Sequence, residues 1–528
     1  MSDQDNNTLG FANGIRLTRR NFLAVLSSAA AVTTLSGPGS LLAQARNNGG
    51  VLTISAPANP SSLDPATGGS GTDHVFLFPM FDTLVEWDYE TLEPKPGLAR
   101  SWEFPDERTL VLHLQEGVEF HDGEPMDAEA VRFNLERART DDRSNIRSDL
   151  ATVETVEITG DLEVTLHLKE PDTALPLILS DRAGMMVSRK AVEELDDRHD
   201  RYPVGAGAMK FVTWDDGDRV AMERNENYWK DDRPLLDGID FRVMTDSSTR
   251  LRAVMSGQSE VAYHLDGRQQ QLLERGGNAE GISGPSVYCY QLYINASRDP
   301  LTNAKVRQAI NHAVDREAFV HATMAGAGEP AYMNLPRDHW AFDPEVAELY
   351  PYDPDRAREL LKEAGYPDGV ELDLRGYTDQ ASVQRQELLL EQFEKAGIRG
   401  RFRTGTIAEV SAAFFGSEKA GDLLLSAWTG RPDPSLSYAL MYLEDAYFNS
   451  GRVAPPEGFN EALQRSRSTD DLDERAVALS EVQRLVMESA MVVPLAFRQD
   501  IIAYSTEVQG LRPNLLGKPK FEDVYLEA

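Results

Sequence analysis

The chain has one cysteine, Cys289, in 528 residues. A single cysteine excludes an intramolecular disulfide, so stability must come from burial of apolar surface. After Ala45 the sequence also lacks any run of 18 or more apolar residues, which excludes a membrane-spanning helix in that part of the chain. The remaining stretch of about 480 residues is long enough for two or three domains with sizeable cores.

Positive charge is also scarce in this sequence. There are 53 lysines and arginines against 86 aspartates and glutamates, which gives a formal net charge of −33 at pH 7. A field of that sign repels nucleic acid and anionic lipid surfaces, so we expect no nucleic-acid partner. The surplus of acid is typical of a solvated acidic surface. Attraction of cationic ligands is the alternative that the composition leaves open.

The sequence also lacks the common catalytic motifs. The sequence has no His-Glu-x-x-His zinc pattern, no Gly-x-Ser-x-Gly nucleophile turn and no phosphate-binding glycine loop. The nine histidines are scattered, without a paired-ligand spacing. Cys289 lies in an apolar segment, which suits an inert buried thiol better than a nucleophile. We therefore expect a protein that is not an enzyme and that uses no cofactor and no metal site. A secreted peptidase is the alternative.

The N-terminus carries the pattern of an export signal. Residues 18–23 read Thr-Arg-Arg-Asn-Phe-Leu, an apolar run follows over 24–35, and Ala-Gln-Ala at 43–45 ends the segment. This pattern predicts a twin-arginine signal peptide over residues 1–45, cleaved after Ala45. No cysteine stands near the cleavage site, so we expect no lipid anchor there and a soluble protein in the periplasm of a two-membrane bacterium. An ordinary helix with two chance arginines is the alternative.

Apolar periodicity alternates between strand and helix patterns along the rest of the chain. Segment 287–294 is apolar on both faces, which predicts a buried central strand. The alternation implies an α/β fold with mixed sheets flanked by helices, and it makes a cleft between two lobes plausible. Among the predicted strands are 109–114, 153–159, 164–168, 287–294, 423–426 and the hairpin 211–214 with 220–223. Among the predicted helices are 127–138 with Asp127 as N-cap, 304–313, 383–396 and 472–489.

Eight short segments occur in an order typical of one family. They are Ser-Leu-Asp-Pro at 62–65, Phe-Asp-Thr-Leu-Val at 81–85, Pro-Gly-Leu-Ala-Arg-Ser-Trp at 96–102, and the segments 112–123, 203–207, 223–229, 306–316 and 360–366. Each segment alone is weak evidence, but their ordered combination is specific and spans nearly all of the mature chain. On these residues the chain resembles the periplasmic substrate-binding proteins of ABC importers, in the oligopeptide, dipeptide, nickel and opine class (family 5).

The resemblance implies a two-lobed periplasmic-binding-protein fold with mixed sheets, a hinge and an extra inserted domain. Transferred to this chain, lobe I comprises 46–80, 204–288 and 494–528. The inserted domain is 81–203, and lobe II is 289–493. The implied function is capture of a small-molecule ligand in the cleft and its delivery to a membrane permease by a receptor that we expect to be a monomer.

The loop after the predicted strand 423–426 is the main candidate for ligand contact, because open sheets bind ligands at the carboxyl ends of their strands. In peptide-binding relatives the position three residues after Trp428 is typically an aspartate that anchors the peptide amino terminus. Here it is Arg431, which suits a carboxylate or other oxyanion and cannot hold an ammonium group. Asp433 could still receive an ammonium group, so zwitterions stay possible. Pairing of Arg431 with a neighbouring acid is the alternative.

Five further residues are candidates for the ligand site. Tyr288 and Tyr290 share one face of the predicted strand 287–294 and offer hydroxyls or stacking surface, as does the ring of Trp428. Arg375 and Tyr377 follow a predicted strand, near where relatives bind a peptide carboxylate. Core packing is the alternative for the aromatic residues. For the ligand itself, a carboxylate or zwitterion competes with an oligopeptide or dipeptide, and a metallophore of the nickel type is a third possibility.

Overall fold

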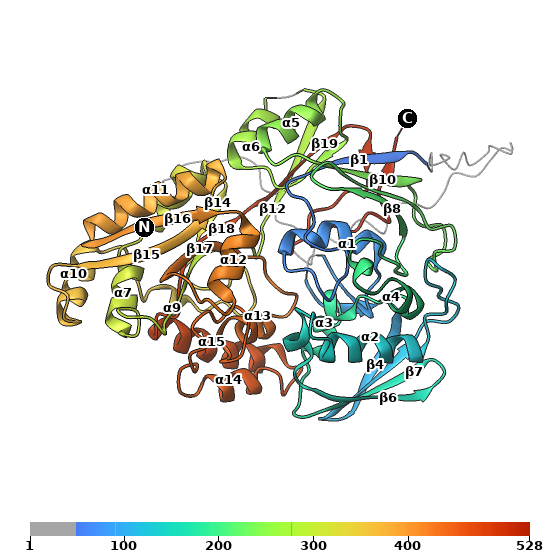
Figure 1. Cartoon of the computed structure of the whole chain (residues 1–528), viewed down its shortest axis with the longest axis horizontal. Coiled ribbons are helices and arrows are strands. Elements are labelled where there is room, and N and C mark those ends of the chain that lie inside the picture. The colour runs from blue at the N-terminus through green and yellow to red at the C-terminus, as the bar shows by residue number, and fades with distance from the viewer. Residues whose placement is uncertain (1–48, 90, 276, 528) are drawn as a thin grey trace, which may run out of the picture. The chain divides into compact units, whose positions relative to one another are not determined.

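The computed structural model describes residues 49–527, except Glu90 and Gly276. The predicted signal peptide, residues 1–45, lies outside the described residues. Two large mixed sheets, a four-stranded antiparallel sheet, two two-stranded sheets and the helices around them make up the described part of the chain (Figure 1). In that part no helix is long and apolar enough to cross a membrane.

The first large sheet has seven strands and draws on early, middle and late parts of the sequence. Its central strand β1 is parallel to both of its neighbours, whereas the other pairings are antiparallel. The predicted hairpin forms one edge of this sheet. The strand order is β12 (Ala279–Gly284), β19 (Asp500–Ser505), β11 (Val261–Ala262), β1 (Val51–Ala56), β10 (Gly238–Val243), β9 (Arg219–Arg224) and β8 (Met209–Asp215).

The second large sheet has six strands, and the predicted central strand is observed inside it. β13 pairs with β18 on one side and β17 on the other, antiparallel to both. Helices α7 (Ala304–His312), α8 (Arg316–Met324), α10 (Pro354–Glu363) and α11 (Gln380–Lys395) belong to the same part of the chain. The strand order is β14 (Gly328–Pro330), β18 (Val492–Arg498), β13 (Cys289–Ile294), β17 (Leu423–Trp428), β15 (Val370–Tyr377) and β16 (Ile398–Gly405).

The third sheet is antiparallel and lies between β1 and β8 in the sequence. Its order is β4 (Ala99–Asp106), β5 (Thr109–Leu114), β7 (Glu163–Leu168) and β6 (Val153–Gly160). Helix α2 (Ala128–Thr140) packs on β6 and β7. As predicted, Asp127 caps α2, because its carboxylate accepts a hydrogen bond from the Ala130 amide at 3.0 Å.

Helices α13 (Pro434–Tyr442), α14 (Phe459–Arg465) and α15 (Leu472–Glu488) follow the second sheet's strand β17 in the sequence. One apolar cluster contains both Leu166 of β7 and Leu440 of α13. The third sheet and these helices therefore share a core.

The chain passes between the two large sheets at two places. One crossing leads from β12 to β13, and the other leads from β18 to β19 with only Gln499 between them. The boundary expected at 493/494 would cut β18, which pairs with β13 over its length. The strands therefore place this crossing about residue 499, while the other domain boundaries stay a prediction.

Candidate functional site

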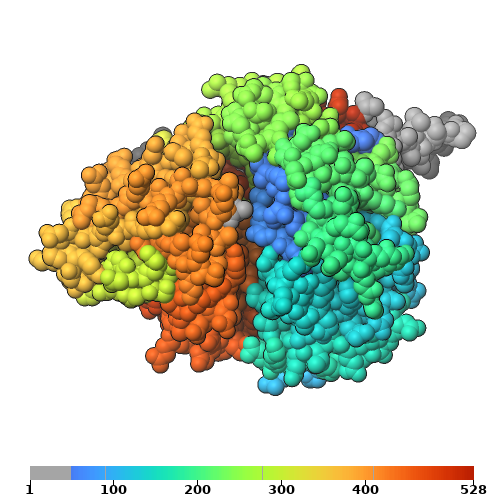
Figure 2. All heavy atoms as spheres, in the orientation of Figure 1, coloured from blue at the N-terminus to red at the C-terminus, as the bar shows by residue number. Residues whose placement is uncertain are grey.

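A cavity of about 310 Å³ lies between residues of the two large sheets and their loops. One wall comes from residues 68–75, 145–146 and 516–518, and the opposite wall comes from β13, β15, β17 and the loops that follow them. Figure 2 shows the surface hollowed between the blue to green residues and the orange ones. This volume is at the lower end of the range for small-molecule pockets.

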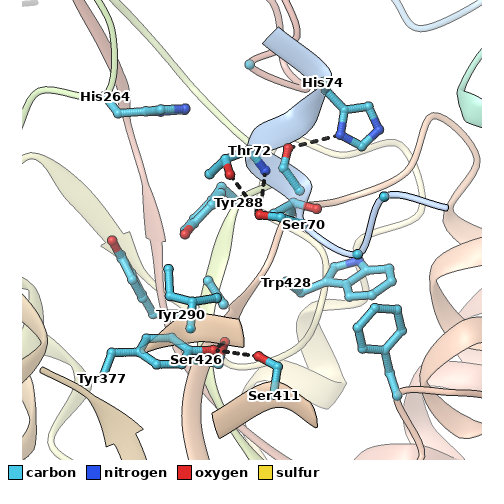
Figure 3. A pocket seen from close by; sticks show the side chains of 18 of the residues that line it. Ser70, Thr72, His74, His264, Tyr288, Tyr290, Tyr377, Ser411, Ser426 and Trp428 are labelled. Atoms are coloured by element: carbon cyan, nitrogen blue, oxygen red, sulfur yellow. Dashed lines mark hydrogen bonds between the residues drawn. The ribbon is translucent and has the colours of Figure 1, made fainter. Parts of the chain in front are cut away.

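Tyrosines form much of the wall on the side of the second sheet. Tyr288 precedes β13 and Tyr290 lies on it, with ring centres 5.4 Å apart in an edge-to-face arrangement. Tyr377 ends β15, and its hydroxyl lies 2.8 Å from the Ser426 hydroxyl of β17. Figure 3 shows these side chains around the cavity. The structure thus brings the three predicted tyrosines together at the cavity, and their contact with a ligand stays a prediction.

Trp428 and Arg431 line the same cavity at the end of β17. The Trp428 indole donates a hydrogen bond to the Ser437 hydroxyl at 3.1 Å, which orients the ring. The Arg431 guanidinium lies 4.8 Å from the ring centre and donates to the Gly430 carbonyl at 2.9 Å. Gly430 has φ of +81°, and a Cβ there would come within 2.1 Å of Val287, so the turn that carries Arg431 requires glycine.

Arg431 has no carboxylate within 4.0 Å among the residues that the structure describes. The acids that feel its charge are Asp149 and Asp181. Burial raises the pKa of Asp149 to about 6, and the positive charge of Arg431 opposes that rise. Pairing of Arg431 with a neighbouring acid, the alternative in the sequence analysis, is therefore not seen at ion-pair distance in the described part of the chain.

Two other cations of the cavity wall are already paired. The Lys518 ammonium lies 2.6 Å from Asp181, and His74 Nε2 lies 2.8 Å from the other carboxylate oxygen of Asp181. Burial would raise the pKa of Asp181, but Lys518 and His74 hold it well below its ordinary value. Arg182 pairs with Asp73 at 3.2 Å and also donates to backbone carbonyls of the loop 68–70. These two cations hold the wall together.

Arg385 of α11 and Arg498 at the end of β18 also line the cavity, and neither was predicted from the sequence. The Arg385 guanidinium lies 4.3 Å from the centre of the Tyr290 ring, and that of Arg498 lies 4.0 Å from the Tyr288 ring. The sequence does contain a pattern that indicates Arg498, since it is a cation at the end of an apolar strand in a very acidic chain. Arg385 lies inside an amphipathic helix, where sequence gives no sign of which arginine faces a cavity.

Asp433 does not line the cavity. Its side chain is fully buried, accepts a hydrogen bond from the Ser435 amide at the start of α13, and forms an ion pair with Arg475 at 2.6 Å. Burial would raise the pKa of Asp433, but Arg475 holds it below its ordinary value. This carboxylate is therefore engaged by the protein itself, and we no longer include it among the proposed ligand contacts.

Arg375 also lies outside the cavity wall. Its guanidinium pairs with Asp373 of the same strand at 2.9 Å. A side chain two residues away on a strand lies on the same face, so Arg375 and Tyr377 share a face, but only Tyr377 reaches the cavity. We therefore do not propose Arg375 as a ligand contact.

Comparison with known proteins identifies the class. The model of the bacterial extracellular solute-binding proteins, family 5 (middle), matches residues 93–450. The chain therefore belongs to this family, which supplies the solute receptors of ABC importers, and the predicted family is confirmed.

Curated relatives match over most of their length. The glutathione-binding protein GsiB of Escherichia coli K12 is 28% identical over 478 residues, which cover 87% of this chain and 91% of the relative. GsiB of Pectobacterium atrosepticum is 29% identical over 480 residues, covering 88% and 92%.

Solved structures share the fold. DppA of Helicobacter pylori, in complex with the peptide STSA, has a TM-score of 0.85 at 24% identity and covers 92% of this chain and 99% of its own. AgaA of A. tumefacien R10, in complex with agropinic acid, has a TM-score of 0.84 at 23% identity, covering 91% and 99%. The predicted two-lobed α/β binding-protein fold is confirmed by these likenesses.

Proposed function

We propose that this receptor captures a small ligand through at least one carboxylate, and that Arg431 is the anchor. The observation that carries the proposal is a guanidinium in the cavity wall with no protein carboxylate within 4.0 Å among the described residues. A half-buried guanidinium is stabilised by an anion, and bidentate hydrogen bonds to a carboxylate suit its planar shape. An acidic protein with a cationic cavity selects anions locally, although its overall field repels them.

Glutathione is the first ligand to test. The curated relatives named above are glutathione-binding proteins, and glutathione carries two carboxylates and one ammonium group at neutral pH. Asp379 is an acidic side chain of the cavity wall and offers a place for an ammonium group. A dipeptide fits the same logic, whereas a cavity of about 310 Å³ disfavours long peptides.

The cellular setting is part of the proposal. The paired arginines and the Ala-x-Ala site support export by the twin-arginine pathway and cleavage after Ala45. The receptor would then work as a monomer in the periplasm and hand its ligand to an ABC permease in the inner membrane. A transport receptor releases its ligand chemically unchanged, whereas a secreted peptidase would cleave it.

A thermal-shift screen with calorimetry tests the ligand class. The probes are glutathione and three five-carbon compounds whose two end groups are anionic, neutral or cationic, namely glutarate, glutaramide and 1,5-diaminopentane. A bound ligand raises the melting temperature by mass action. We expect glutathione or glutarate to bind and the neutral and cationic probes not to bind.

Two variants test the anchor. Arg431→Gln removes the charge and is expected to weaken binding of the anionic probes by about tenfold or more. Arg401→Gln removes an exposed arginine of β16 outside the cavity and is the matched control. Binding of only neutral or cationic probes, or unchanged affinity in Arg431→Gln, would contradict the proposal. Mass spectrometry of glutathione after incubation shows whether it is returned unaltered.

A further inference from the structure

Arg385 and Arg498 occupy one end of the cavity together. Their guanidinium groups lie over the neighbouring rings of Tyr290 and Tyr288, which are themselves 5.4 Å apart. Burial raises the pKa of Tyr288, and both arginines oppose that rise, so both charges act on one tyrosine. The two cations therefore converge on the same part of the cavity wall.

Both guanidinium groups have spare hydrogen-bond donors. The hydrogen bond of the Arg385 guanidinium goes to the Ser382 hydroxyl at 3.3 Å. Arg498 contacts His264 Nδ1 at 2.5 Å, and its Nε has no hydrogen-bond partner among the described residues although it is buried. The nearest acid to Arg498 is Asp500, at 4.0 Å, beyond hydrogen-bond range.

Arginines elsewhere in the interior are treated differently. Arg475 is paired with Asp433 at 2.6 Å, and Arg137 is paired with Asp64 at 2.5 Å. Arg250 has no such acid, but its guanidinium donates to four backbone carbonyls at 2.7–3.0 Å. These three buried guanidinium groups are therefore satisfied by acids or by carbonyls. Arg385 has neither, and Arg498 has only His264 and, at 4.0 Å, Asp500. Both guanidinium groups would be stabilised by an anion from outside, because desolvation of a poorly paired charge is unfavourable.

This end of the cavity is separate from the end that holds Arg431. The charge of Arg431 acts on Lys518, which lines the cavity, and on Asp149 and Asp181, which lie behind the lining residues. Figure 3 shows Tyr288 and Tyr290 on the left of the close-up, below His264, and Trp428 on the right. Arg431 lies over Trp428, whereas Arg385 and Arg498 lie over the two tyrosines. The cavity thus has two cationic ends.

We propose that Arg385 and Arg498 form a second anion-binding position, so that the ligand carries two anionic groups and spans the cavity between this position and Arg431. The inference rests on the proposed function and specifies its ligand class. The chemistry that fits is a small dicarboxylate, with or without an ammonium group that Asp379 would receive. The planar guanidinium of Arg385, stacked on Tyr290, keeps its edge donors free for one carboxylate.

The position also lies at a crossing between the lobes. Arg498 ends β18 of the second sheet, two residues before β19 of the first sheet begins, and its contact His264 follows β11 of the first sheet. A carboxylate bound here touches a residue at the junction of the two lobes. Ligand binding at this end would therefore favour the closed arrangement that makes these contacts.

Calorimetry with matched dicarboxylates and their monoamides tests the second position. The probe pairs are succinate with succinamate, glutarate with glutaramate, and adipate with adipamate, together with glutathione and its glycine-carboxylate monoamide. Each pair differs in one negative charge at nearly equal size. We expect at least one diacid to bind about tenfold or more tighter than its monoamide, because a charge-assisted hydrogen bond at that carboxylate is lost.

Three variants assign that preference to residues. Arg385→Gln and Arg498→Gln should each bring the affinities of diacid and monoamide close together while the monoamide still binds. Arg401→Gln, on the exposed edge strand β16, should keep the preference. If Arg498→Gln does not fold, Arg385→Gln and Arg498→Lys carry the test, since lysine keeps the charge and removes the planar pair of donors.

The binding measurements distinguish failure of the second anion-binding position from failure of the proposed function. If monoanions bind through Arg431 and no diacid is preferred more than about twofold, the second position is overturned and the proposed function stands. A preference that survives in both Arg385→Gln and Arg498→Gln also overturns it. If neither glutathione nor any carboxylate binds at millimolar concentration, the anionic ligand class fails, and the second position fails with it.

Discussion

His121 and Gly205 exchange two hydrogen bonds. The His121 amide donates to the Gly205 carbonyl at 2.8 Å, and the Gly205 amide donates to His121 Nδ1 at 3.3 Å. Because Nδ1 accepts, the ring proton is on Nε2, which donates to the Gly207 carbonyl at 3.0 Å. Two of the short segments that marked the family in the sequence, 112–123 and 203–207, therefore meet through one neutral imidazole.

The first prediction concerns pH. Burial lowers the pKa of His121 to about 4, whereas an unfolded histidine titrates near 6.5. Between these values the unfolded chain binds a proton that the folded chain does not, so this residue makes stability fall as pH falls below about 6.5. From pH 7 to pH 5 the loss from His121 alone is about 2 kcal/mol.

Urea denaturation at the two pH values measures this loss. The variant His121→Gln has no titrating ring, so the difference in unfolding free energy between pH 7 and pH 5 should shrink by about 2 kcal/mol relative to the parent. Its stability at pH 7 is itself lower, because hydrogen bonds to the glycine turn are lost. An unchanged pH difference would show that another group accounts for the acid sensitivity.

The second prediction concerns the glycine turn that His121 contacts. A Cβ on Gly207 would lie 2.4 Å from the Met80 carbonyl carbon, which is backbone and cannot move aside. Gly207→Ala is therefore expected to destabilise the protein by about 2 kcal/mol or more. Gly217→Ala is the control, because a Cβ there has open space and only its φ of +72° opposes alanine, at a cost of about 1 kcal/mol. Equal losses in the two variants would contradict the steric explanation.

Several strands and long helices were within reach of sequence reasoning. Predicted helix 472–489 is observed as α15, and predicted strand 287–294 is observed as β13, because periodicity and two-sided apolarity are local properties. Helix α13 was missed. All nine of its residues are buried, so it lacks the polar face that gives a helix its periodicity. Its start signal, Asp433 followed by Pro434, was present but was interpreted as a ligand loop.

The site was predictable only in part for a related reason. Trp428 ends β17 and Arg431 follows it by three residues, so sequence order keeps them together. Arg385 and Arg498 belong to a helix and a strand end far apart in the sequence, and only the tertiary fold places both in the wall of one cavity. The charge at each position can be read from a sequence, but the ion pairs cannot. Tertiary contacts decide that Asp433 pairs with Arg475 and that Arg431 has no carboxylate partner among the described residues.

The third prediction tests the structural role of Asp433. Asp433→Asn keeps a capping side chain but leaves the buried Arg475 without its anion, so we expect a loss of about 3 kcal/mol or more in urea denaturation. Asp471→Asn, at the exposed N-cap of α15, is the control and should cost less than about 1 kcal/mol. If Asp433→Asn were as stable as the control yet bound glutathione more weakly, the residue would be a ligand contact after all.

The fourth prediction concerns hydrogen bonds between the segment after the third sheet and the region of α14, away from the cavity. The amide and hydroxyl of Thr173, which follows the third sheet, donate to the carbonyls of Arg467 and Thr469 at 2.8 and 2.7 Å. Gln464 of α14 donates to the Pro171 carbonyl at 2.7 Å beside them. If the lobes open to admit a ligand, these bonds exist only in the closed arrangement, and they contribute to affinity through the closed state.

The variant Thr173→Val therefore tests whether these bonds stabilise the closed state rather than the fold as a whole. It removes one hydroxyl at nearly constant volume, so the closed state loses about 1 kcal/mol and affinity for an anionic ligand should fall about fivefold. The unfolding free energy without ligand should change much less, because the open state makes no use of this bond. Thr159→Val is the control, since it removes a hydroxyl paired with Thr165 within the third sheet at 3.1 Å. Equal affinity in both variants, measured by calorimetry, would mean that the contact persists in the open state and that opening occurs elsewhere.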